Sequence, residues 1–87
     1  MWYVYIIECA DNSLYTGITI NPERRVLEHN TSSKGAKYTK TRRPVNLVYV
    51  ETWPDRSSAT KREYQIKKLT RKNKLLLINH HKNKNNE

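Results

Sequence analysis

The stretch that decides the fold lies near the N-terminus and reads Tyr3-Val4-Tyr5-Ile6-Ile7, followed shortly by Leu14-Tyr15-Thr16-Gly17-Ile18-Thr19-Ile20. Both segments are rich in β-branched and aromatic residues, which favour strands. Side chains in a strand alternate between its two faces. Each predicted strand therefore has an aliphatic face suited to a core and a second face that carries tyrosines. Because Gly17 lies on that tyrosine face, we expect the face to be polar, shallow and open.

A polar turn between Cys9 and Ser13 joins the two strands into a hairpin. Tyr5 and Tyr15 share a face only if the loop holds an odd number of residues. A three-residue loop of Ala10-Asp11-Asn12 sets Tyr5 opposite Gly17. The phenol then lies over bare backbone and leaves room for a ligand, and we predict this register.

The remaining chain predicts three helices and one more strand. Asn21 and Pro22 are a typical N-cap and first helical residue, and that helix runs to about Asn30. The elements that follow are a basic loop (Thr31 to Pro44), a strand (Val45 to Trp53), a helix (Ser58 to Leu69, capped by Asp55 or Ser57) and a last helix (Arg71 to about Asn79). The expected fold is α/β: a small three-stranded, mainly antiparallel sheet flanked by helices, in the order strand-strand-helix-strand-helix-helix. Residues 1–80 form a single domain, and 81–87 a polar, disordered tail.

Charge dominates the composition. The 87 residues include 17 Lys and Arg against 8 Asp and Glu, a net charge of +9. This excess favours a polyanionic partner, although ribosomal proteins and membrane-surface peptides share it. No apolar run approaches the roughly 20 residues of a membrane span. The single cysteine excludes an intramolecular disulfide, and we expect a cytoplasmic protein without a membrane partner.

Two segments carry candidate ligand-binding side chains. On the first predicted helix Arg25 and His29 are four residues apart and share a face, while Val26 and Leu27 supply the packing. The basic loop interleaves cations with an aromatic residue, a pattern suited to phosphate contacts and base stacking. A solvated connection is an equal alternative. The loop's candidate side chains are Lys34, Lys37, Tyr38, Lys40, Arg42 and Arg43.

Glu63 is the unusual residue of the second long helix. Its position falls between Ala59 and Ile66 on the arc expected to be buried, where helices normally avoid charge. An ion pair with Lys67, four residues on, is the plain explanation. That pair accounts better for a surface glutamate than for one that borders the core, so a functional role is favoured.

These residues together resemble the GIY-YIG nuclease superfamily. Its first tripeptide corresponds to Tyr3-Val4-Tyr5, with Tyr3 where the family name has glycine, and its second to Tyr15-Thr16-Gly17. An arginine on the next helix, a histidine one turn on and a glutamate on a later helix correspond to Arg25, His29 and Glu63. The chain is most similar to the small stand-alone bacterial branch, which is itself similar to the catalytic subunit of eukaryotic structure-selective endonucleases.

The resemblance implies metal-dependent hydrolysis of DNA phosphodiester bonds, in repair or recombination. It implies that Glu63 binds one divalent cation, Mg²⁺ or Mn²⁺, that Arg25 stabilises the phosphate, and that Tyr5 and Tyr15, assisted by His29, act on the attacking water. Gly17 and the basic loop then contact DNA, and a protein partner supplies specificity. The alternative is a DNA- or RNA-binding module that does not cut; a pure binder gains nothing from a carboxylate in a basic groove.

Overall fold

The structure, a computed structural model, describes residues 1–32 and 34–85. Its elements are β1 (Trp2–Glu8), β2 (Leu14–Thr19), α1 (Pro22–Thr31), α2 (Lys37–Lys40), β3 (Asn46–Trp53), α3 (Arg56–Lys67) and α4 (Arg71–Asn85). The three strands form one antiparallel sheet in the order β2-β1-β3. The α/β class and the order of the main elements are confirmed, and α2 is a short addition inside the predicted basic loop.

The hairpin has the predicted register. Tyr5 pairs with Gly17, and the pairing closes where the Cys9 N–H donates to the Ser13 carbonyl at 2.8 Å. Three residues remain in the loop, and the last of them, Asn12, has a φ of 69°. An asparagine tolerates this left-handed conformation, which a three-residue hairpin loop requires.

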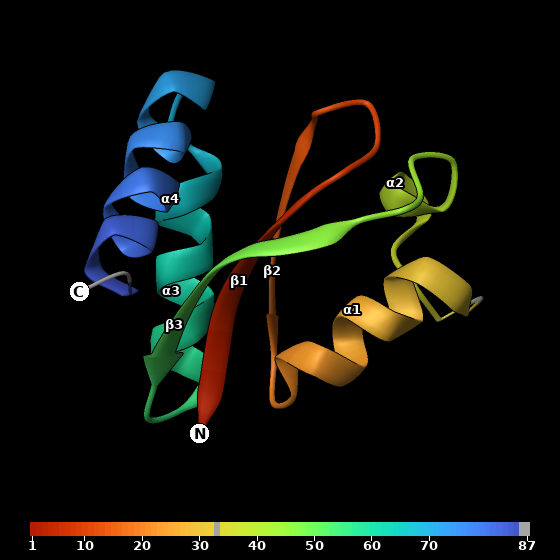
Figure 1. The fold of residues 1–87 in the computed structure, drawn as a ribbon. Helices are drawn as coiled ribbons and strands as arrows, with labels where there is room; N and C mark the ends of the chain where they lie inside the picture. Colours follow the sequence, from red (N-terminus) through yellow and green to blue (C-terminus); the bar gives the residue numbers. More distant parts are fainter. Residues whose placement is uncertain (33, 86–87) are drawn as a thin grey trace.

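Helices cover both faces of the sheet (Figure 1). On one face Val4 and Ile6 pack against Ala59 and Ile66 of α3 and Ile78 of α4. The opposite face carries a second cluster, in which Val26 of α1 packs against the buried residues Tyr5, Ile7, Cys9 and Val45. The tyrosine face is therefore the α1 side of the sheet, and α3 lies on the other side.

Strand β3 departs from simple alternation. A β-bulge opposite the Ile6–Ile7 step makes Ile6 pair with Tyr49 and Ile7 with Leu47. The extra residue, Val48, joins Tyr49 in the α3/α4 core. Simple alternation along the strand would put Val48 on the face of Val50 and Leu47 on the face of Tyr49; the bulge reverses both positions.

The N-terminal ends of α1 and α3 have the predicted caps, whereas α4 ends later than predicted. Asn21 Oδ1 accepts from the Arg24 N–H at 3.1 Å, and Asp55 Oδ1 accepts from the Ser58 N–H at 2.7 Å. Helix α4 continues through Asn85 rather than ending near Asn79, because no glycine or proline interrupts the lysines and asparagines there. The tail predicted over 81–87 is thus helical as far as Asn85, and 86–87 lie outside the described residues.

None of the helices in the described ranges, 1–32 and 34–85, is long and apolar enough to cross a membrane.

Candidate active site

The site is built around a buried hydrogen-bonded chain on the α1 side of the sheet. The Tyr5 hydroxyl lies 2.8 Å from His29 Nε2, and Nδ1 of the same imidazole lies 3.0 Å from the Thr39 hydroxyl. Thr39 in turn donates to the Ala36 carbonyl at 2.9 Å. The Ala36 backbone N–H donates to the same Nδ1 at 3.3 Å, so Nδ1 is an acceptor and Nε2–H of the neutral imidazole donates to the Tyr5 hydroxyl. This arrangement links β1, α1 and α2 through a neutral imidazole.

Gly17 makes room for the Tyr5 ring. A Cβ atom at position 17 would lie 2.5 Å from Tyr5 Oη and 2.7 Å from Cζ. Tyr5 is only 1% exposed. The prediction of an open face with space for a ligand above Gly17 is therefore wrong at this point, because the phenol itself fills that space. The glycine serves to seat Tyr5 flat against β2.

Arg25 lies beside the Tyr5 hydroxyl, and hydrogen bonds to α1 and to the loop after it hold the guanidinium. Its Nη1 donates to Glu28 Oε1 at 3.0 Å and to the Lys34 carbonyl at 2.8 Å. Gly35 allows this approach, since a Cβ there would lie 2.8 Å from the Glu28 carbonyl oxygen. Both bonds come from one nitrogen. The rest of the guanidinium fork is left for the Tyr5 hydroxyl, which it adjoins, and for an anion.

Glu63 acts on the same hydroxyl from the other side of the sheet. The pKa of Tyr5 responds to the charges of Arg25 and Glu63 and to Tyr15, so these groups lie within electrostatic range of one atom. The position of α3 is fixed by Arg62, whose Nε donates to Glu51 Oε1 on β3 at 2.8 Å. Glu63 also pairs with Lys67 Nζ at 3.5 Å, and its side chain keeps 20% exposure.

Tyr15 extends the cluster toward solvent. Its ring packs edge-on against His29, with centroids 5.4 Å apart, and stacks on Tyr38 at 5.9 Å. The Arg42 guanidinium covers the other side of Tyr38, 4.0 Å from the ring centroid. Tyr38 is 40% exposed. The aromatic series therefore leads from the buried chain to the surface at α2.

Burial keeps both members of the central hydrogen bond neutral. It raises the pKa of the Tyr5 phenol to about 12, although the adjacent Arg25 acts in the opposite direction. Burial also lowers the pKa of the His29 imidazole to about 4, and the positive charge of Arg25 contributes to that shift. At neutral pH the positive charges near this hydrogen bond belong to Arg25 and Arg43 rather than to the imidazole.

The GIY-YIG catalytic domain matches residues 1–76. The chain belongs to the GIY-YIG family. It is 61% identical over 77 residues to a UPF0213 protein of Desulfotalea psychrophila, across 88% of this chain and 70% of that one. A UPF0213 protein of Staphylococcus haemolyticus is 59% identical over 76 residues, across 87% and 92% respectively.

A solved structure agrees with the same assignment. The solution NMR structure of a UPF0213 protein from Bacillus halodurans matches with a TM-score of 0.58 at 45% identity, over 91% of this chain and 84% of that one. The predicted membership of the small bacterial branch of GIY-YIG proteins is confirmed. The domain is of the type found in the GIY-YIG nuclease superfamily.

Four of the GIY-YIG residues predicted from the sequence lie around Tyr5: Tyr15, Gly17, Arg25 and His29. Glu63 lies on α3, which packs on the opposite face of the sheet, and its charge contributes to the raised pKa of Tyr5. Leu27, expected to pack, is 60% exposed; His29 is fully buried and takes its place. Sequence reasoning missed Thr39 and Glu28. The spacing of Arg25 and Glu28 is a visible i,i+3 signal, whereas Thr39 reaches His29 only through the fold.

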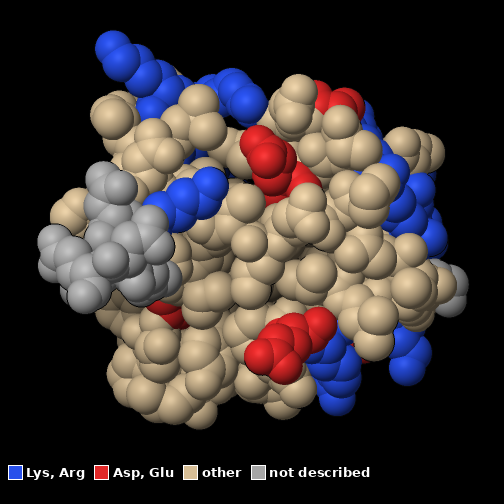
Figure 2. Space-filling view, viewed as in Figure 1, with Lys and Arg blue, Asp and Glu red and all other residues tan. Residues whose placement is uncertain are grey.

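The basic loop divides into two groups. Arg42 donates to Asp11 at 3.0 Å and to the Tyr38 carbonyl at 2.8 Å, and Arg43 donates to the His29 and Ser32 carbonyls. These two arginines hold the loop in place. Lys34, Lys37 and Lys40 are exposed. In Figure 2, Lys and Arg gather along the right-hand edge, over α1 and α2, and at the upper left beside the start of α4.

The donor set at Glu63 fits a hard divalent cation. The described residues contain no group of three or more His, Cys, Asp or Glu side chains that could enclose a metal. Glu63 is a single, partly exposed carboxylate whose charge reaches the Tyr5 phenol. Mg²⁺ is commonly held by one or two carboxylates and keeps several waters, so one carboxylate is compatible with this ion and with Mn²⁺.

Substituting Gly17 tests the seating of Tyr5. Gly17→Ala is expected to lower the free energy of unfolding by about 2 kcal/mol, because the added methyl overlaps a buried ring that is itself hydrogen-bonded. Chemical denaturation measures this. Thr16→Val is the control on the same strand: the Thr16 hydroxyl is buried without a hydrogen-bond partner among the described residues, so stability should hold or rise. Unchanged stability of Gly17→Ala would mean that Tyr5 moves aside freely.

Proposed function

We propose that the protein hydrolyses DNA phosphodiester bonds with one divalent cation bound at Glu63. The observation that carries this is the grouping of Arg25, His29 and Tyr15 around the buried Tyr5, with the charge of Glu63 within electrostatic range of its hydroxyl. A carboxylate, an arginine fork and phenols are the groups that this chemistry requires. The family match supports DNA as the substrate. Repair or recombination is the setting that the resemblance implies, with a protein partner for specificity.

Each residue has a role that its environment supports. Arg25 donates to the scissile phosphate and stabilises the charge that develops there. Tyr15, which is less buried than Tyr5, orients the attacking water. Tyr5 is buried, His29 fixes its hydroxyl, and that hydroxyl adjoins Arg25. When bound, the cation supplies Lewis-acid stabilisation of the phosphate charge. Gly17 contributes by seating Tyr5.

The experiment is a cleavage assay on branched, nicked, single-stranded and blunt duplex DNA, with Mg²⁺ or Mn²⁺ and with EDTA. Metal-dependent cleavage of at least one substrate is expected. Tight binding without cleavage of any substrate under either metal would favour the alternative, a non-catalytic nucleic-acid-binding module. Cleavage in EDTA would contradict the role given to the cation.

Exposed lysines near the site should set the salt dependence of binding. Replacing Lys34, Lys37 and Lys40 together with glutamine is expected to flatten the slope of log affinity against log salt by about 2, since each neutralised phosphate contributes roughly 0.7 to 0.9. Fluorescence anisotropy across a salt series measures the slope. Arg42 and Arg43 stay unchanged in this test, because their hydrogen bonds hold the loop.

The matched control replaces three exposed lysines on the helices of the opposite sheet face: Lys61, Lys72 and Lys82. It removes the same charge and should leave most of the slope in place. Equal flattening by both triple variants would show that net charge, rather than the α1/α2 surface, attracts the nucleic acid.

A further inference from the structure

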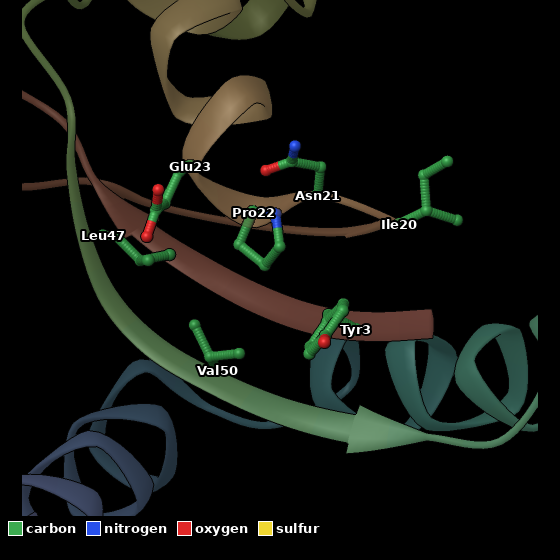
Figure 3. A pocket seen from close by; sticks show the side chains of 7 residues that line it. All are labelled: Tyr3, Ile20, Asn21, Pro22, Glu23, Leu47 and Val50. Atoms are coloured by element: carbon green, nitrogen blue, oxygen red, sulfur yellow. The ribbon is translucent and has the colours of Figure 1, made fainter. Parts of the chain in front are cut away.

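A cavity lies on the tyrosine face of the sheet, next to the candidate active site. It has a volume of about 520 Å³ and opens between the start of α1 and the sheet (Figure 3). Apolar side chains from three elements surround it, with an amide and a carboxylate among them. The lining residues are Tyr3, Ile20, Asn21, Pro22, Glu23, Leu47 and Val50.

The cavity lies beside the buried Tyr5, on the same face of the sheet. On β1, Tyr3 and Tyr5 share a face two residues apart, which is about 7 Å. On α1, Pro22 and Arg25 share a face one turn apart. Val50, in the cavity wall, pairs with Tyr5. The cavity is therefore displaced from Arg25 by about two residues of β1 and one turn of α1. This displacement is comparable to the spacing of neighbouring nucleotides in an extended strand.

We infer that this cavity binds one unpaired nucleobase of the DNA substrate, on the nucleotide next to the phosphate held by Arg25. The proposal rests on the proposed function for the position of that phosphate. Tyr3 offers an aromatic face for stacking, and Pro22, Leu47 and Ile20 form apolar walls (Figure 3). The Asn21 amide oxygen caps α1, which leaves its NH₂ group to donate to a base edge, and Glu23 accepts from amino groups.

The shape of the cavity favours DNA that presents an unpaired base. A base inside a duplex is stacked on both sides and enters such a cavity only by leaving the stack. A flap, a single-stranded end or a mismatch presents a base that is already free. The chain's net charge of +9 also favours a polyanionic ligand. The site therefore favours DNA with an unpaired nucleotide at the cut.

The test compares two labelled strands of equal length and charge, an oligothymidylate and a fully abasic oligonucleotide, by anisotropy in EDTA. Tyr3→Leu is expected to weaken oligothymidylate binding about tenfold and to leave abasic-strand binding unchanged. Tyr64→Leu is the matched control, since Tyr64 is 61% exposed on α3 and outside the cavity. It should change neither affinity.

A second pair of variants guards against loss of fold. Ile20 in the cavity wall and Leu76 on α4 are each 57% exposed. Ile20→Ser should weaken oligothymidylate binding about threefold without affecting the abasic strand, and Leu76→Ser should change neither. If folded Tyr3→Leu and Ile20→Ser both keep the parent preference for bases, the inference is overturned. Base-dependent binding with no cleavage under any metal would instead remove the proposed function and leave the cavity as a base-binding site.

Discussion

Glu63→Ala is expected to reduce metal-dependent cleavage by a factor of about 10³ or more, while DNA affinity stays equal or becomes tighter. The substitution removes the carboxylate proposed to bind the cation, and it also removes a negative charge from the proposed phosphate-binding site. Single-turnover cleavage with Mg²⁺ or Mn²⁺ measures the first effect. Anisotropy in EDTA measures the second. An active Glu63→Ala protein would assign the metal, or the activity, to other groups.

Lys67→Ala is the matched control for this variant. It breaks the same ion pair, whose Nζ–Oε2 distance is 3.5 Å, but keeps the carboxylate. Exposed i,i+4 pairs contribute about 0.5 kcal/mol, so both variants should unfold near the parent. If cleavage is lost in Lys67→Ala as well, the ion pair rather than a metal ligand is what activity requires.

The hairpin could be predicted because it depends on local rules. The parity of strand faces and the short polar loop together set Tyr5 opposite Gly17, and the observed register is the same. The helix caps at Asn21 and Asp55 are equally local. The bulge at Val48 could not be predicted from local rules, because it accommodates packing against two helices that lie later in the chain.

The candidate site could be predicted as a set of residues but not as an arrangement. The resemblance implies that Arg25 and Glu63 act at one site with Tyr5 and Tyr15. Both charges influence the pKa of Tyr5, yet their helices cover opposite faces of the sheet. Local periodicity describes which face of a helix is apolar and does not say which sheet face receives it. The complete burial of Tyr5 and His29 also depends on Thr39 and α2, contacts that span the fold.

Arg25→Ala should lower cleavage by about 10² to 10³ and also weaken DNA binding modestly, a pattern that differs from that of Glu63→Ala. The guanidinium is proposed to donate to the phosphate in the bound ground state and more strongly in the transition state. Its removal therefore weakens both DNA binding and the cleavage step. Its removal leaves the Lys34 carbonyl and the Glu28 carboxylate without this partner. Stability should therefore fall by about 1 kcal/mol, which thermal unfolding measures.

The neighbouring residue supplies the control. Arg24 carries the same charge on the same helix, has a side chain that is 64% exposed and reaches Glu28 only at 3.8 Å. Arg24→Ala should keep cleavage close to the parent value. Arg25→Lys adds a second comparison, because lysine preserves the charge without the planar fork: binding should recover while cleavage stays low. Full recovery of cleavage in Arg25→Lys would show that charge alone acts on the phosphate, and equal losses in Arg24→Ala and Arg25→Ala would remove Arg25 from the site.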